Sequence, residues 1–182
     1  MPNTNRIISP YIPDGNPDHM NVASLYAPGD LGAAFDFNDR AYQVVQVDSG
    51  ATVSTPIGVV AEHQLAFWKD KDKYLVTNDD RVAIGQPTAN AFRNQVAGVF
   101  RVAATAGRYV CILQRADHVY VHGAQGGGIG QTIIAQTTGT GQVTFEAVGG
   151  NRTYQKLGVA REATSATLAN HVYVDLDITN IP

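Results

Sequence analysis

Apolar and polar positions follow two different patterns along this chain, with the change near residue 28. From Gly29 onward, short runs of β-branched and aromatic residues alternate with Gly, Asn, Asp or Pro. This pattern is typical of an antiparallel β-sandwich or β-barrel. A parallel α/β sheet would need long helical crossovers, whereas the best helical candidate is the short segment 88–95. The runs that predict strands are 41–47, 55–62, 73–77, 81–85, 96–102, 108–114, 118–123, 131–136, 142–148 and 171–178.

The last of these runs alternates strictly. Apolar side chains stand at every even position from Val172 to Ile178, and Tyr173, Asp175 and Asp177 stand between them. The alternation predicts a strand with one buried face and one solvated face.

Three segments, 57–62, 97–101 and 157–162, share an apolar-Gly-Val-apolar pattern with a charge soon after. Their spacing is uneven, which argues against a solenoid of equal repeats. We interpret them as three hairpins with similar turn chemistry, in which glycine permits a bulge or a close approach of two backbones.

The first 28 residues have neither helical nor strand periodicity. Five of the eight prolines lie there, among Asn, Asp and Gly, so we predict an extended N-terminal arm at 1–28 before a β-rich domain at 29–182. Its apolar residues are too hydrophobic for a tail in water, and we expect them to pack on this domain or on a neighbouring chain. These predicted partner-binding residues are Ile7, Ile8, Tyr11 and Ile12.

Composition excludes several classes of function. The chain of 182 residues is 44% hydrophobic and 16% charged, with a formal charge of -3, which is typical of a globular protein and not of a disordered one. Lysine and arginine form no cluster, so we expect no nucleic-acid partner. No run is long enough to span a bilayer and no secretion signal is recognisable at the start, so we expect no membrane partner. The single cysteine, Cys111, is interpreted as a buried thiol within a strand.

The densest glycine stretch, 123–130, invites comparison with phosphate-binding loops. At the position of the P-loop lysine stands Gln131, the third glycine of a dinucleotide fingerprint is missing, and a strand-like run follows instead of a helix. We therefore expect a loop tip or a subunit contact here, and no cofactor.

Other candidate chemistry is weak. His118 and His122 lie on a predicted strand, where they share a face but spread too far apart for one metal ion; His63 and His171 stand alone in the sequence. No nucleophile elbow is present, and the sequence leaves open only a pair of carboxylates brought together from distant strands. We predict that the chain is not an enzyme.

Phe67 and Trp68 precede a turn of alternating charges, 69–73. Two interpretations remain open: a core anchor followed by a solvated turn, or an aromatic contact for a partner or a sugar.

With these features placed, the chain resembles head decoration (cement) proteins of tailed bacteriophages. The resemblance rests on APGDLGAAF (27–35), on the GVV, GVF and GVA segments, on RYVCILQRADHVYVHGAQGGGIGQTIIAQTTGTGQV (108–143) and on LGVAREATSATLANHVYVDLDI (157–178). It implies a mostly β domain, often trimeric, that binds the outer surface of the major capsid protein after shell expansion, with an arm reaching neighbours.

The resemblance implies a non-catalytic structural virion protein, made in the host cytoplasm and located on the outer surface of the capsid, with the major capsid protein as partner and a homotrimer as its assembly. The alternative is a β-rich adhesion or carbohydrate-binding module of a phage fibre or spike, using Phe67, Trp68 and nearby tyrosines.

Overall fold

The computed structural model describes residues 26, 28–37, 39–48, 59–79, 95–123, 127–136, 141–146, 155–162 and 171–178. Within these ranges the regular structure is β, apart from a 3₁₀ turn at Pro28–Asp30. The predicted strand 81–85 and residues 88–94 of the helical candidate lie outside the described residues. The strands are β1 Ala34–Phe37, β2 Arg40–Val47, β3 Val59–Val60, β4 Leu65–Asp70, β5 Leu75–Thr77, β6 Val96–Phe100, β7 Ala104–Thr105, β8 Tyr109–His122, β9 Thr132–Ala135, β10 Val143–Phe145, β11 Gly158–Ala160 and β12 His171–Asp177.

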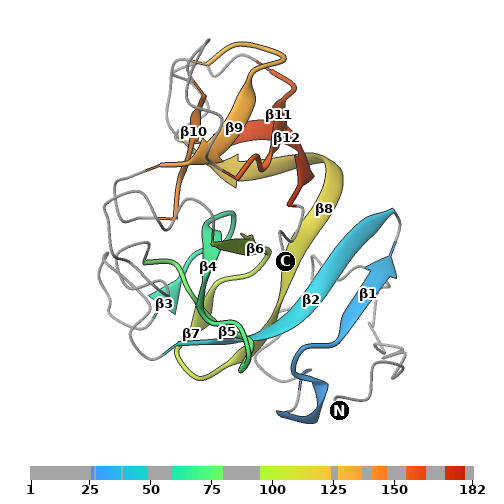
Figure 1. The fold of residues 1–182 in the computed structure, drawn as a ribbon, viewed down its shortest axis with the longest axis vertical. Coiled ribbons are helices and arrows are strands. Elements are labelled where there is room, and N and C mark those ends of the chain that lie inside the picture. The colour runs from blue at the N-terminus through green and yellow to red at the C-terminus, as the bar shows by residue number, and fades with distance from the viewer. Residues whose placement is uncertain are drawn as a thin grey trace.

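Five strands close into a barrel in the order β2-β5-β4-β6-β8, because β2 pairs with β5 on one side and with β8 on the other. Strand β1 extends the sheet from β2, and the short pair β3–β7 stands beside the barrel. The barrel occupies the lower half of the molecule in Figure 1. The predicted mainly β fold is confirmed, and its closed part is a barrel.

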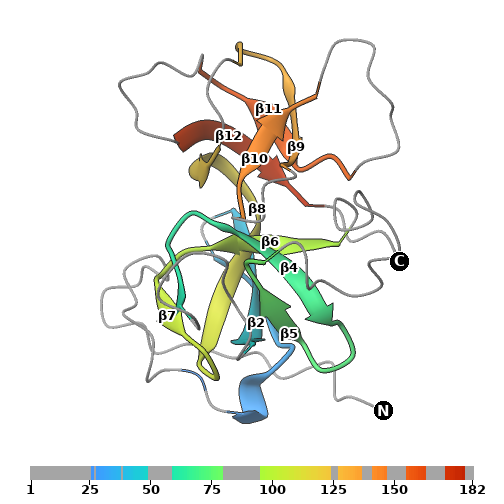
Figure 2. The ribbon, with the colours of Figure 1, turned by 90° about the vertical axis from the view of Figure 1, so that its left-hand side faces the viewer.

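Strand β8 leaves the barrel and continues the same ten-stranded sheet into an upper part of the molecule. Its first half pairs with β2 and β6, and its second half pairs with β12. Strands β11, β9 and β10 follow in that order, and a bridge between Gly123 and Val143 brings β10 back toward the end of β8. We call β8 (115–122), β12, β11, β9 and β10 the upper sheet, which lies above the barrel in Figures 1 and 2.

Two clusters of buried side chains explain why both faces of the central strand β6 are apolar. One cluster draws residues from all five barrel strands, among them Val45, Trp68, Val76, Ala97 and Ile112, and fills the barrel. The other joins the opposite faces of those strands to the inner face of the upper sheet. Because both of its faces are covered, β6 is buried at every position, as expected for a strand between two packed layers.

Glycines in the repeated segments permit close approach of strands. A Cβ at Gly98, within β6, would stand 2.8 Å from the Leu113 carbonyl oxygen, and one at Gly158, within β11, would stand 1.9 Å from that of Asp175. The predicted close approach of backbones is confirmed at both positions, although both glycines lie within strands and not in turns.

The strands β1, β4, β7 and β11 lie outside the predicted runs, and two further features differ from the sequence interpretation. The runs 108–114 and 118–123 form one strand, β8, that continues through the polar residues between them. Tyr26, within the predicted arm, is buried in the core, so this residue packs on the domain that follows it.

Candidate interaction surface

The residues predicted to bind a partner are not brought together by the described part of the structure. Ile7, Ile8, Tyr11 and Ile12 lie outside the described residues. Phe67 is fully buried and Trp68 is 6% exposed, on opposite faces of β4. These two aromatics therefore belong to the core, which corresponds to the first of the two interpretations, and neither offers an exposed ring to a partner or a sugar.

The solvent side of the upper sheet carries a different set of rings. Directly opposed residues of paired strands project to the same side of a sheet, and the pairs here are His122 with His171, Tyr120 with Tyr173, and Asp175 with Val159. The intervening residues, such as Val119, Val121, Val172 and Val174, are buried on the inner side. We call the solvent side of this sheet the ring face; its members are His118, Tyr120, His122, Val159, Arg161, His171, Tyr173 and Asp175.

The rings are in mutual contact along the ring face. The centroids of Tyr120 and Tyr173 lie 4.8 Å apart, and those of His118 and Tyr173 lie 5.5 Å apart. His63, from the segment between β3 and β4, continues the row with centroids 6.5 Å from Tyr120 and 5.2 Å from His171. Such separations suit edge-to-face and tilted aromatic pairs, so the row is packed as a unit.

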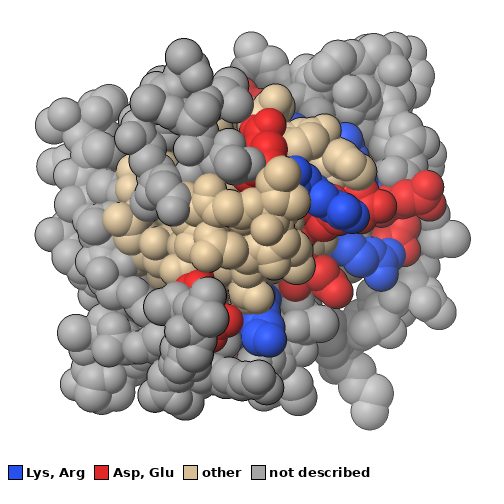
Figure 3. Space-filling view, turned by 90° about the horizontal axis from the view of Figure 1, so that it is seen from above, with Lys and Arg blue, Asp and Glu red and all other residues tan. Residues whose placement is uncertain are grey.

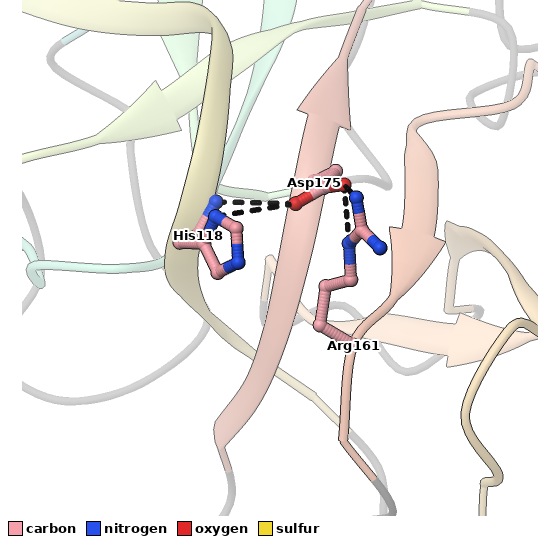
Figure 4. A network of polar contacts seen from close by, with 3 residues as sticks. All are labelled: His118, Arg161 and Asp175. Carbon is pink, nitrogen blue, oxygen red and sulfur yellow. Dashed lines mark hydrogen bonds and ion pairs between the residues drawn. The ribbon is translucent and has the colours of Figure 1, made fainter.

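A polar network stands beside the tyrosine pair (Figure 4). The backbone N–H of His118 donates to Asp175 Oδ1 at 3.2 Å, and the Arg161 guanidinium binds Asp175 Oδ2. His118 has a positive φ of 57°, and the register between β8 and β12 shifts next to Asp175. The Asp175 carboxylate thus stabilises the sheet where the register of β8 and β12 is irregular. Its hydrogen bond with Arg161 lowers the pKa of Asp175 below its ordinary value.

Three of the histidines form a cluster that sequence reasoning missed. The ring centroid of His171 lies 5.2 Å from that of His63 and 5.6 Å from that of His122. The backbone N–H of His122 donates a hydrogen bond to the backbone carbonyl of His63 at 2.8 Å. Partial burial, together with the neighbouring imidazoles, lowers the pKa of His122. No group of three His, Cys, Asp or Glu side chains suited to a metal ion is found among the described residues.

Two charged side chains contact His63 at the edge of this cluster. Glu62 Oε1 lies 3.5 Å from its Nε2, and Arg101 Nη1 lies 3.3 Å from its Nδ1. Strand alternation could have placed His122 opposite His171 once β8 and β12 were known to pair, but the sequence does not show which strands pair or where the segment with His63 returns.

Large hydrophobic side chains that are exposed also gather in the upper sheet and in the turn before β9. Among the described residues, Ile129 is 72% exposed, and Tyr120 and Val159 are each 41% exposed. Seen from this end of the molecule, the middle of the described surface is uncharged, with most acidic and basic side chains on one side and a few along the lower edge (Figure 3).

Ile129 lies in the glycine-rich stretch considered above. Gly130 N–H donates to the Ala160 carbonyl at 2.8 Å, and Ala160 N–H donates to the Gln131 carbonyl at 2.9 Å. The stretch therefore turns beside β11, and Ile129 comes next to the strand that carries Val159. We call Ile129 and Val159 the apolar tip.

Comparison with models of known protein families and with curated protein sequences gives no match. The described helical structure includes no segment long and apolar enough to cross a membrane.

Proposed function

We propose that this chain is a capsid decoration protein, a non-catalytic structural protein of a phage virion that binds the outer surface of the major capsid protein shell and stabilises it. It acts as a homotrimer on the capsid, after synthesis in the host cytoplasm. The proposal joins the sequence resemblance to a mainly β domain whose exposed hydrophobic side chains are gathered in one half of the molecule.

The distribution of exposed hydrophobic side chains carries the proposal. All three exposed large hydrophobics of the described residues, Tyr120, Ile129 and Val159, lie in or next to the upper sheet, and the described residues of β2, β5, β4, β6 and the barrel half of β8 present none. A single exposed apolar residue is ordinary, but a grouped set marks a contact surface. In this proposal the barrel is the rigid support and the apolar tip faces the shell.

The apolar tip is too small to act alone. Burying two aliphatic side chains contributes about 3–6 kcal/mol, which is comparable to or smaller than the entropic cost of association. Binding therefore needs further contacts, which we assign to the predicted arm at 1–28 and to the avidity of a trimer.

The test measures saturable binding of the full-length chain to expanded shells of the coat protein by co-sedimentation. Ile129→Asp and Val159→Asp should each weaken binding by about ten- to a hundredfold, because each loses about 1.5–3 kcal/mol of apolar burial. Thr105→Asp is the matched control: it adds the same charge at an exposed position of β7 and should bind as the parent does.

The contribution of the arm is tested separately. Because Tyr26 is part of the core, the deletion should end before it, at residue 24, so that the β domain keeps its packing. We expect the shortened chain to bind shells more weakly. Unchanged binding of both the shortened chain and the Ile129→Asp variant would contradict the proposed docking mode.

A further inference from the structure

We propose that the ring face holds a neutral saccharide, with Tyr120 and Tyr173 as the stacking platform and Arg161 as the principal hydrogen-bonding group. This site adjoins the apolar tip, because Val159 lies opposite Asp175 in the same sheet, but it uses other side chains and goes beyond the proposed role on the capsid.

The first observation is an aromatic pair on a solvated strand face. Tyr120 and Tyr173 stand opposite each other on β8 and β12 with centroids 4.8 Å apart and an angle of 41° between their planes. Tyr120 is 41% exposed, so part of its ring is open to solvent. A pyranose ring presents C–H groups on one face, and such a face packs on an aromatic ring while its hydroxyls stay outward. His118, tilted against Tyr173 at 5.5 Å, extends the platform by a third ring.

The second observation is a set of oriented polar groups at the edge of that platform. Arg161 binds Asp175 through Nε and one terminal nitrogen, and its side chain is 52% exposed. A guanidinium has five N–H donors in a fixed plane, so donors remain for sugar hydroxyls while Asp175 fixes the orientation of the plane. The arrangement is therefore preorganised, which reduces the entropic cost of binding.

The third observation is the charge balance, which selects the ligand class. Arg161 is paired with Asp175, and Asp117 adds to the negative potential at Arg161. A nucleic-acid strand would also stack on aromatics but requires a positively charged groove, and the described residues of this face form none. An uncharged glycan needs no such groove, so the face suits neutral hexopyranosides.

The experiment titrates the full chain with cellohexaose, maltohexaose and a β-1,4-galactan hexasaccharide, followed by amide chemical shifts in NMR. At least one should bind with millimolar or tighter affinity and shift the amides of β8 and β12. Tyr173→Ala and Tyr120→Ala should each weaken that binding about tenfold or more, which corresponds to about 1.4 kcal/mol, whereas Tyr173→Phe should keep it because the ring is retained.

Arginine variants provide the matched pair. Arg161→Gln should weaken binding, and Arg115→Gln should not, although Arg115 is similarly exposed at 58% and also faces a carboxylate, Asp36 at 3.7 Å. Thermal unfolding of every variant separates lost binding from lost folding. Absence of binding to all three oligosaccharides, or equal loss in both arginine variants, would overturn the proposal. Binding only to an acidic glycan such as heparin would overturn the assigned ligand class.

Discussion

Gly158→Ala is the substitution that we expect to destabilise the upper sheet most. The φ of Gly158 is +151°, a conformation that residues with a Cβ rarely adopt, and a Cβ there would lie 1.9 Å from the Asp175 carbonyl oxygen and 3.1 Å from Leu176 Cα. The obstructing atoms belong to the backbone of β12, the strand that lies between β8 and β11. Gly158→Ala must therefore move one strand away from the other.

Two costs add at this position. A disfavoured backbone conformation costs about 1–3 kcal/mol, and overpacking against a fixed neighbour costs about another 1–3 kcal/mol. We take the sum as about 4 kcal/mol, a large fraction of the stability of an ordinary domain. For a chain of this size each kcal/mol lowers Tm by about 2–4 °C, so the expected decrease is about 8–16 °C.

Gly130→Ala is the control that separates the two costs. Gly130 also has a positive φ, +82°, but nothing lies within 4 Å of its added Cβ, so only the backbone cost of about 1–2 kcal/mol remains. Both variants are compared with the parent by urea and thermal unfolding monitored by circular dichroism, with the urea m-value as a check that the transition is unchanged. If Gly158→Ala lowers the free energy of unfolding no more than Gly130→Ala does, the close packing of β11 against β12 is contradicted.

Three further predictions concern the core and the histidine cluster. Phe67→Ala should lower the free energy of unfolding by about 3–5 kcal/mol, because it opens a cavity at a fully buried position; a loss below 1 kcal/mol in urea unfolding would contradict this burial. Burial raises the pKa of Cys111 to about 12, so a thiol reagent at pH 8 should label the native chain hardly at all and the urea-unfolded chain fully; equal labelling rates would show the thiol to be exposed. The pKa of His122 is lowered from 6.5 in the folded chain, so its neutral form stabilises the fold fully above that pH and this stabilisation is lost as pH falls below it. Between pH 7.5 and 5.5 the parent should lose more stability than His122→Gln, and parallel losses would contradict the role of His122.

Strand patterns predicted much of the fold because burial and strand period act locally. The even positions from Val172 to Ile178 are buried as predicted, and β2 and β6 lie within the predicted runs 41–47 and 96–102 apart from the first residue of β2. The unbroken course of β8 was missed because polar residues interrupt its apolar run at the point where it leaves the barrel. There the positive φ of His118 and the register shift beside Asp175 change the strand direction, and neither has a local sequence signal.

The sequence could not predict the ring face, because its residues come together only through the pairing of strands. Tyr120 and Tyr173 are far apart in the chain and meet only through the pairing of β8 with β12. His63 joins them because its backbone contacts the end of β8. Conversely, Phe67 and Trp68 were conspicuous as adjacent aromatics, yet a strand covered on both faces buries both neighbours.

The most direct test of the proposed function is a reconstruction by electron cryomicroscopy of expanded capsid shells incubated with the full-length chain. The account predicts added density at symmetry-related sites on the outer surface, with the end of the upper sheet that carries Ile129 turned toward the coat protein. Shells without added density at saturating concentrations, or density that contacts the coat through the barrel alone, would contradict it.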